Sequence, residues 1–574
     1  MTENSKKILQ SKDRPWRKYY TEEQLNASVP QCTLYEYLKN NNKDRLDSIA
    51  LNYFDKEMSY RKLLEDIDLA AEIFIAAGVK RGDTVSVCML TMPETVCIFY
   101  ALNKIGAVCN LIEPRTNPTR IRDHINNSKS KMLFVVDVFV GKINEIINEL
   151  NVDKIVIVPL ANSMPLATKI GFKLTKGRKL PKPAEDKRYI SWNNFLTKCE
   201  RAFVSPAPYT PNWPAAIVYT GGTTGLPKGA ILTNDSFNAL TVEYRNNGME
   251  YKPGQTFLNI MPPFISYGVS CGLNMPLCIG LKMIIIAAFK PEDFAGYVMK
   301  YKPNHFIGVP SHFERLINAP ETQDADLSFV MTAAAGGDSM SLGVEEKINA
   351  FFAAHNCKHH IIRGYGMTEL GSAASTTSDI ADKPESVGIP LPLAAFSVHD
   401  PETGEELGAN EDGELYALLP TRMKEYLNNP EETAKILFND DEGNEWIKTG
   451  DIGHMDEDGF IFIKGRKKRV IIRPDGHNVW PSQIEAVLSQ YPGVKEVATV
   501  GLDNPDGEHG KLPTAFIVAD DGARNDCVFL QKIEKYAKTH LPERDTPYSY
   551  RFIDELPLTA VGKVDYRALE KTKY

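Results

Sequence analysis

The sequence has few long apolar runs, no paired cysteines and no surplus of positive charge. It contains no run of about 18 apolar residues, so it predicts no membrane-spanning helix, and the nearest candidate, residues 276–289, is short and carries Lys282. The first residues, MTENSKKILQSKDRPW, lack the apolar core of a signal peptide. Its nine cysteines include no C-x-x-C pair and are odd in number, which argues against a disulfide framework or a zinc site. The formal net charge of −8 argues against nucleic acid as a partner. We therefore expect a cytoplasmic protein that does not bind nucleic acid.

The remaining composition is that of an ordinary globular protein. At 574 residues the chain is too long for one hydrophobic core, so several domains or subdomains are expected. Apolar β-rich runs at residues 83–90, 131–137 and 154–160 alternate with helical patterns such as residues 94–108. This alternation predicts an α/β fold with a largely parallel sheet.

A basic segment spans residues 161–188, with eight Lys or Arg residues against two acidic ones. Leu166, Ile170 and Leu174 follow one another at helical spacing, with Lys169 and Lys173 beside them. A basic amphipathic helix of this kind can lie on an anionic membrane surface, and the alternative is a solvated surface insertion. The sequence leaves both open.

A second change of composition occurs at residues 465–481, GRKKRVIIRPDGHNVWP. About a hundred residues follow, with helical patterns at 482–494 and 527–541 and strand patterns at 494–502 and 514–520. That length is sufficient for a small separate domain.

The loop in residues 217–233, IVYTGGTTGLPKGAILT, is rich in glycine and threonine. It lacks the G-x-x-x-x-G-K-[ST] spacing of a P-loop. Glycines allow tight turns with exposed N–H groups, and threonine hydroxyls with Lys228 suit a polyphosphate. A structural turn in a hairpin between the two flanking apolar runs is the alternative.

Further motifs follow in a fixed order: GYGMTELG at 364–371, KTGDIG at 448–453, GRKK at 465–468 and LPLTAVGKVDYRALE at 556–570. With the loop TGGTTGLPKG at 220–229, they resemble the signatures of the adenylate-forming superfamily of acyl-CoA synthetases, luciferases and adenylation domains. Residues 334–340, AAGGDSM, stand where the family has its adenine-binding strip, although Asp338 and Ser339 depart from that pattern. Gly221 also departs, replacing a family Ser or Thr.

The resemblance implies a set of site residues. Lys563, Glu369 and Thr220 would be catalytic, Glu369 and Thr220 would hold Mg²⁺, and Asp451 would bind the ribose hydroxyls. The ring of Tyr365 would stack on adenine, and Lys468 would be the hinge. The implied ATP- and AMP-binding residues are Thr220, Gly221, Gly222, Thr223, Thr224, Gly225, Lys228, Gly336, Gly337, Asp338, Gly364, Tyr365, Gly366, Met367, Thr368, Glu369, Asp451, Arg466 and Lys563.

The resemblance also implies the architecture. It predicts a large N-terminal domain of stacked mixed α/β sheets with a small β subdomain, over residues 1–467. A small mobile α+β domain would follow over residues 468–574 and would rotate to bring Gly476 to the thioester-forming step. At this face Arg469 and Ile472 depart from residues common in the family.

The implied activity is that of an AMP-forming acid–CoA ligase with ATP, Mg²⁺ and CoA. The family strip L-P-L-F-H-x-x-G resembles residues 261–268, where Ile265 replaces the histidine, which favours an apolar acid. A medium- to long-chain fatty acid is preferred, and an aromatic, bile or o-succinylbenzoate-type acid is the alternative. A carrier protein loaded in trans is an alternative acceptor, and a monomer and a homodimer both stay open. The predicted acid pocket comprises Phe264, Ile265, Gly268, Val309, Gly336, Gly364 and Ser372.

Overall fold

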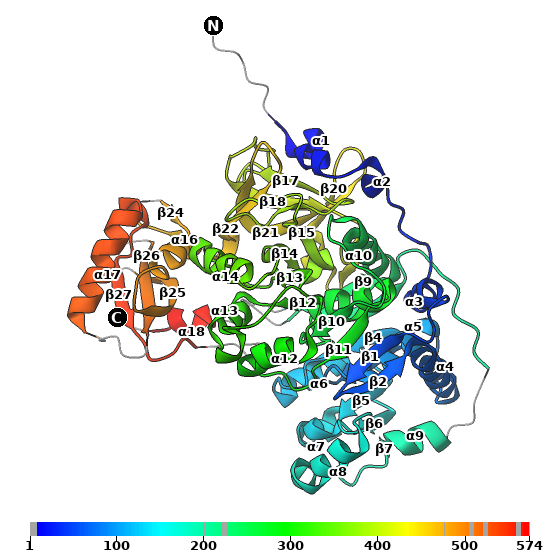
Figure 1. Cartoon of the computed structure of the whole chain (residues 1–574). Helices are drawn as coiled ribbons and strands as arrows, with labels where there is room; N and C mark the ends of the chain where they lie inside the picture. Colours follow the sequence, from blue (N-terminus) through cyan, green and yellow to red (C-terminus); the bar gives the residue numbers. More distant parts are fainter. Residues whose placement is uncertain are drawn as a thin grey trace.

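Two large sheets form the core of the protein (Figure 1). The computed structural model describes residues 8–198, 203–220, 227–475, 477–503, 510–520, 526–557 and 564–572. The nine-stranded sheet has the order β16 (Ile389–Pro390), β15 (Ser372–Thr376), β14 (Ile362–Met367), β13 (Thr332–Ala335), β12 (His305–Gly308), β10 (Thr256–Asn259), β11 (Lys282–Ile285), β1 (Ile49–Tyr53), β2 (Lys56–Ser59). The eight-stranded sheet has the order β19 (Glu425–Tyr426), β9 (Gly229–Thr233), β8 (Pro214–Tyr219), β4 (Val108–Leu111), β3 (Thr84–Cys88), β5 (Met132–Val136), β6 (Lys154–Val158), β7 (Tyr189–Ser191).

Both large sheets are parallel in the middle and antiparallel at an edge. The pairs from β1 through β11, β10, β12 and β13 to β14 are parallel, as are those from β8 to β7. The edge pairs β1–β2, β14–β15 and β8–β9 are antiparallel. The predicted α/β class with a largely parallel sheet is confirmed.

Strand β5 illustrates why an unbroken apolar run forms a strand here. Phe134 packs on Phe74 of α4, with ring centroids 5.3 Å apart, whereas Leu133 belongs to a second core with Ile143 of α7. Successive side chains of a strand point to opposite faces, so a strand covered by helices on both faces has to be apolar at every position.

The helices of the chain are α1 (Gln10–Asp13), α2 (Glu22–Leu25), α3 (Leu34–Asn42), α4 (Tyr60–Ala76), α5 (Pro93–Lys104), α6 (Pro118–Asn127), α7 (Val140–Ile146), α8 (Leu166–Leu174), α9 (Trp192–Lys198), α10 (Asn234–Asn246), α11 (Met275–Ile279), α12 (Phe294–Tyr301), α13 (Pro310–Asn318), α14 (Leu342–Ala354), α15 (Pro430–Ala434), α16 (Pro481–Leu488), α17 (Cys527–His540) and α18 (Tyr566–Glu570).

Smaller sheets complete the fold. A five-stranded sheet contains β17 (Ala395–His399), β18 (Gly413–Leu418), β20 (Leu437–Asn439), β21 (Glu445–Met455) and β22 (Ile461–Arg466). The C-terminal part contains the pair β23 (Ile471–Ile472) and β24 (Asn478–Val479) and the sheet β25 (Val494–Asp503), β26 (Lys511–Ala519), β27 (Ser549–Phe552). These bounds confirm the helices and strands that the sequence predicts after residue 480.

The C-terminal part has its own core. Ile517 of β26 packs with Ile484 of α16 and Ile533 of α17, and Phe516 faces the other way, toward Leu569 of α18. In Figure 1 this part lies beside the larger body, next to α14. Within the described residues, no helix has both the length and the apolar character needed to cross a membrane.

Candidate active site

Thr220 and Lys228 close the base of the glycine- and threonine-rich loop. Strands β8 and β9 form the antiparallel hairpin that the sequence offers as an alternative, with Tyr219 opposite Gly229. The N–H of Thr220 donates to the carbonyl oxygen of Lys228 at 2.9 Å, and the N–H of Lys228 donates to the Thr220 hydroxyl oxygen at 3.3 Å. The hairpin therefore holds the two ends of the loop together. Gly221, Gly222, Thr223, Thr224 and Gly225 lie outside the described residues.

The side chain of Lys228 lies against Tyr426 of β19 and Glu432 of α15. Its Nζ is 3.1 Å from Oε2 of Glu432 and 4.2 Å from the ring centroid of Tyr426. Ion pairs with Lys435 and Lys228 lower the pKa of the Glu432 carboxyl to about 2. Lys228 is thus held, in this form of the protein, by a carboxylate and an aromatic face.

Tyr365, Asp451 and Arg466 form a connected group. The hydroxyl of Tyr365 donates to Oδ2 of Asp451 at 2.5 Å, and Nε of Arg466 lies 2.7 Å from Oδ1. Asp451 and Arg466 are opposite each other in the β21–β22 ladder, so the sheet register creates this ion pair. Burial raises the pKa of Asp451, against the opposing effects of Arg466 and Tyr365. Three residues predicted to contact the nucleoside are therefore brought together.

Glu369 lies in a short 3-10 turn, Thr368–Leu370, directly after β14. Its Oε1 accepts a hydrogen bond from the hydroxyl of Tyr426 at 2.6 Å, and the side chain is buried. Gly371 ends the turn at φ +82°, where a Cβ would lie 2.0 Å from the carbonyl oxygen of Thr421, so only glycine fits. The sequence carries no signal for Tyr426, because the contact arises only when β19 pairs with β9.

The oxygen donors at this site suit magnesium. The described residues contain no group of three or more His, Cys, Asp or Glu side chains arranged to hold a metal ion. Mg²⁺ commonly takes one or two protein carboxylates and completes its shell with water and substrate phosphates. The carboxylate of Glu369 and the hydroxyl of Thr220 fit that requirement.

The predicted adenine strip begins in the last two residues of β13. Gly337 has φ +82°, which favours glycine, and Asp338 is exposed. A Cβ on Gly366 would lie 1.8 Å from the carbonyl oxygen of Ser372, so β14 and β15 can approach each other only with glycine at that position. These glycines are explained by backbone geometry.

A small cavity of about 70 Å³ adjoins the strip. Three predicted acid-pocket residues, Gly336, Gly364 and Ser372, line it. Tyr244, Met249 and Tyr267 also line it, and the sequence analysis did not predict them, although Tyr267 lies within the strip at 261–268. Ligand pockets usually measure roughly 300–1,000 Å³, so a long tail requires these side chains to move.

The other four predicted pocket residues, Phe264, Ile265, Gly268 and Val309, are not among the residues that line this cavity. Gly268 has a packing role, since a Cβ there would lie 1.7 Å from the carbonyl oxygen of Pro262. Tyr267 and Gly268 are the first two residues of the buried π-helical segment Tyr267–Asn274. The hydroxyl of Tyr267 donates a hydrogen bond to the carbonyl oxygen of Ala334 at 3.4 Å.

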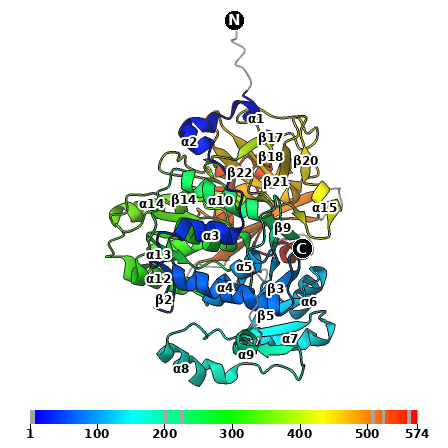
Figure 2. The same cartoon turned by 90° about the vertical axis from the view of Figure 1, so that its right-hand side faces the viewer.

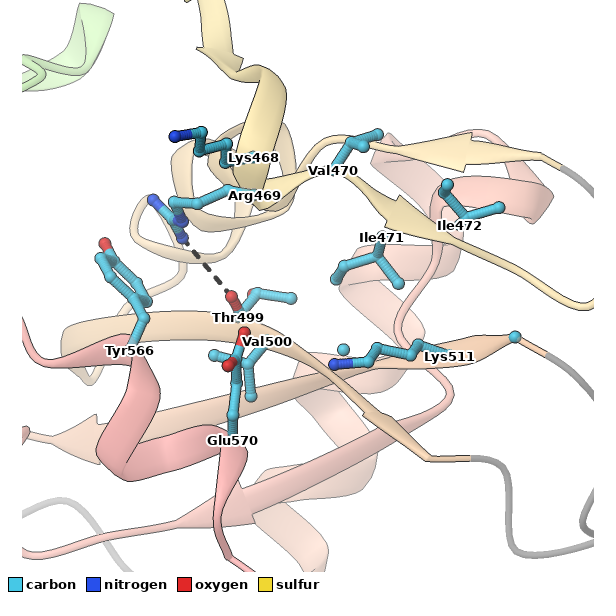
Figure 3. Close-up of a pocket in the computed structure, with 12 residues that line it drawn as sticks. Lys468, Arg469, Val470, Ile471, Ile472, Thr499, Val500, Lys511, Tyr566 and Glu570 are labelled. Atoms are coloured by element: carbon cyan, nitrogen blue, oxygen red, sulfur yellow. Dashed lines mark hydrogen bonds between the residues drawn. The ribbon is translucent and has the colours of Figure 1, made fainter. Parts of the chain in front are cut away.

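The predicted hinge lies at a second cavity, of about 310 Å³ (Figure 3). Lys467 pairs with Glu414 of β18 at 2.8 Å, whereas Arg469 pairs with Glu485 of α16 at 2.8 Å. Figure 3 shows Arg469 extended toward Tyr566 and Thr499, and its guanidinium lies 3.5 Å from the Tyr566 ring centroid. Exposed Lys468 thus separates two residues that are anchored to opposite parts of the protein. Gly476 and Lys563 lie outside the described residues.

Comparison with known proteins gives a consistent result. The AMP-binding enzyme family matches residues 38–427, and the AMP-binding enzyme C-terminal domain matches residues 483–563. A long-chain-fatty-acid–CoA ligase of Bacillus subtilis (strain 168) is 29% identical over 561 residues, which cover 97% of each chain. A long-chain-fatty-acid–CoA ligase of Salmonella typhimurium is 28% identical and covers 91% of each chain.

The fold also matches solved structures. The crystal structure of the anthranilate CoA ligase AuaEII in complex with anthranoyl-AMP superposes with a TM-score of 0.81 at 20% identity, covering 95% of this chain and 98% of that one. The predicted fold class, a large N-terminal domain of mixed sheets with a small C-terminal domain, and the predicted superfamily are confirmed. The family model matches more than half of the length of the chain, so the chain belongs to the AMP-binding enzyme family.

Proposed function

We propose that this protein is an AMP-forming acid–CoA ligase whose acid is a medium- to long-chain fatty acid. The observation that carries the proposal is the connected group Tyr365–Asp451–Arg466 beside an apolar cavity that Gly336, Gly364 and Ser372 line. A nucleoside-binding group that adjoins an apolar pocket suits the joining of ATP to a hydrophobic acid.

In the first step the acid carboxylate attacks the α-phosphorus of ATP. A carboxylate–phosphorus bond forms, the bond to the bridging oxygen of the β-phosphate breaks, and pyrophosphate leaves with the bond electrons. Both reactants are anions, so positive potential at the α-phosphate is the main requirement. We assign that role to Lys563 and the loop 220–228, with Asp451 holding the ribose and Tyr365 the adenine. Magnesium, held by Glu369 and Thr220, would neutralise phosphate charge.

In the second step the thiol of CoA loses its proton and its sulfur attacks the acyl carbonyl. The carbon–sulfur bond forms, the carbon–oxygen bond to AMP breaks, and AMP leaves. We propose that residues 468–574 rotate about Lys468 between the steps and bring Gly476 to the site. The opposite anchoring of Lys467 and Arg469 supports a hinge between them.

Two observations bear on the acid in opposite directions. The relatives named long-chain-fatty-acid–CoA ligase favour a fatty acid. The 70 Å³ cavity favours a compact acid, and an aromatic acid is therefore kept as the second candidate. Bile acids and o-succinylbenzoate-type acids are further alternatives, and the panel of acids described below tests them as well.

The remaining proposals concern the thiol that accepts the acyl group and the location of the enzyme in the cell. We take free CoA as the acceptor, with a carrier protein loaded in trans as the alternative, and we place the enzyme in the cytoplasm, where residues 161–188 contact a membrane surface. A monomer and a homodimer are both compatible with this scheme.

The decisive experiment is a panel of carboxylic acids from short to long chain, with aromatic and bile acids, scored by pyrophosphate release with and without CoA. Exchange of labelled pyrophosphate into ATP with fatty acids and thioester formed with free CoA would support the proposal. No exchange with any acid of the panel would refute the proposed ligase activity. If the thioester forms only on a carrier protein, the acceptor is a carrier protein and not free CoA.

A further inference from the structure

We propose that helix α8 docks this protein onto the surface of a membrane that contains anionic lipids. The docking surface, called the α8 face, consists of Leu166, Ile170 and Leu174 with the exposed basic residues around them. The sequence leaves a membrane contact and a solvated insertion open, and the exposure of these side chains is what favours the membrane.

The apolar part of the α8 face points away from the protein. Leu166, Ile170 and Leu174 are 74%, 49% and 55% exposed, although each carries a large apolar side chain. They lie four residues apart on one helix, so they form a continuous stripe. Phe172 of the same helix packs against the main core, which fixes the helix with this stripe outward. Single exposed leucines are ordinary, but a stripe of three on one short helix needs an explanation.

Basic side chains accompany the stripe along the chain. Lys173 lies on α8, and exposed basic residues follow it at Lys176, Arg178, Lys179 and Lys182. None of these five forms an ion pair with another described residue, in contrast to Arg188, which pairs with Asp186 at 2.8 Å. The protein as a whole carries a formal charge of −8, so this positive charge is local. Apolar side chains flanked by lysine and arginine are the pattern of an interfacial helix on anionic lipid.

The position of α8 allows a flat surface to reach it. In Figures 1 and 2, which view the molecule from two sides, α8 lies at the same lower end of the molecule, away from α1 at the other end. A broad, nearly planar partner can therefore contact α8 without meeting the rest of the chain first.

A second copy of this chain fits the surface less well. A stable protein interface usually buries more than about 1,000 Å² in total, and three side chains on a nine-residue helix offer far less. Two α8 faces placed together would also oppose their lysines. A bilayer needs only shallow burial of the stripe and supplies the negative charge.

The test uses the full-length protein and vesicles of two compositions, phosphatidylcholine alone and phosphatidylcholine with phosphatidylglycerol. One variant combines Leu166→Ser, Ile170→Ser and Leu174→Ser, and a second combines Lys173→Glu, Lys176→Glu and Lys179→Glu. Val528→Ser is the matched control, because Val528 is 52% exposed on the distant helix α17. Circular dichroism and pyrophosphate exchange with a water-soluble acid check that each variant is folded.

We expect the wild type and Val528→Ser to sediment with the anionic vesicles, and both triple variants to bind them at least about 10-fold more weakly, because one variant removes the apolar side chains that enter the bilayer and the other reverses the charge that attracts anionic lipid. Added salt should weaken the wild-type binding. Failure of the wild type to bind anionic vesicles, or equal binding by all variants, would overturn the proposal. Loss of self-association in the leucine variant, without vesicle binding by the wild type, would assign the surface to a second copy. The vesicle measurement needs no catalysis, so its outcome is independent of the proposed ligase activity.

Discussion

The hydroxyl of Tyr426 donates a 2.6 Å hydrogen bond to Oε1 of Glu369, a residue 57 positions earlier in the chain. The face of the same ring lies 4.2 Å from Nζ of Lys228. One tyrosine therefore contacts both the carboxylate proposed to hold magnesium and the lysine at the end of the phosphate loop. We assign Tyr426 the role of a positioning residue, which acts through Glu369 and Lys228.

Tyr426→Phe should impair magnesium use while leaving the ring under Lys228 in place. A hydrogen bond to a charged group is worth roughly 1.5–3 kcal/mol, so a fall in pyrophosphate exchange of about 10- to 100-fold is expected. The Mg²⁺ concentration for half-maximal rate should rise. Tyr416→Phe is the matched control, since Tyr416 is a buried tyrosine of β18 whose ring stacks on His399. An unchanged magnesium dependence in Tyr426→Phe would show that the contact is only structural.

Lys563→Ala should abolish pyrophosphate exchange and leave ATP binding intact. Removal of one donor that stabilises transition-state charge typically costs about 10²–10³ in rate. Exchange kinetics measure the loss, and equilibrium binding of ATP shows that the nucleotide site persists. Lys511→Ala, which removes a lysine from the cavity at the hinge, is the control and should retain exchange. Comparable exchange in the two variants would reject Lys563 as the catalytic lysine.

Met249→Trp should restrict the enzyme to acids with shorter chains. Met249 lines the 70 Å³ cavity, and its flexible side chain can move to admit a tail. The larger, stiffer indole should lower kcat/KM for long-chain acids by about 10-fold or more, which corresponds to roughly 1.4 kcal/mol. Short acids, tested on the same variant, provide the control and should lose little. A loss that is equal for all chain lengths would place the tail elsewhere.

Glu243→Gln should stabilise the protein as the pH rises. Glu243 is fully buried on α10, where Oε2 accepts from the N–H of Leu393 at 3.0 Å, and burial raises its pKa from 4.5 to about 8. Below pH 4.5 the carboxyl is protonated in both the folded and the unfolded chain, so it causes no pH dependence. Between pH 4.5 and 8 only the unfolded chain ionises, so the free energy of unfolding falls by up to about 1.4 kcal/mol per pH unit.

Thermal unfolding at a series of pH values measures this effect. The difference in melting temperature between Glu243→Gln and the wild type should grow from pH 5 to pH 8 and then level off. Glu346→Gln, at an exposed position of α14, is the control and should track the wild type. A difference that does not change with pH would contradict the raised pKa of Glu243.

Much of the local secondary structure could be predicted from the sequence. The run at residues 132–136 is apolar at every position, and a strand covered on both faces accounts for that pattern. The spacing of Leu166, Ile170 and Leu174 identifies α8 in the same way. These patterns depend on a period of two or of about 3.6 residues, which is a property of the chain itself.

The motif residues could be identified from the sequence because their order along the chain resembles the family pattern. Thr220, Tyr365, Glu369, Asp451 and Arg466 were identified in this way, and the family match supports the resemblance. The same reasoning missed Tyr244 and Met249, because no motif marks the end of α10 as a neighbour of the cavity, and it left out Tyr267, which lies within the strip at 261–268.

The sequence by itself therefore determined the α/β class, the identity of the motif residues and the amphipathic character of α8. Only the tertiary structure decided that Tyr426 holds Glu369, that Glu243 is buried and that the stripe on α8 faces outward. The physical reason is that periodicity and glycine geometry act within a few residues. A contact between distant residues depends on strand register and helix packing, which exist only when the whole chain has folded.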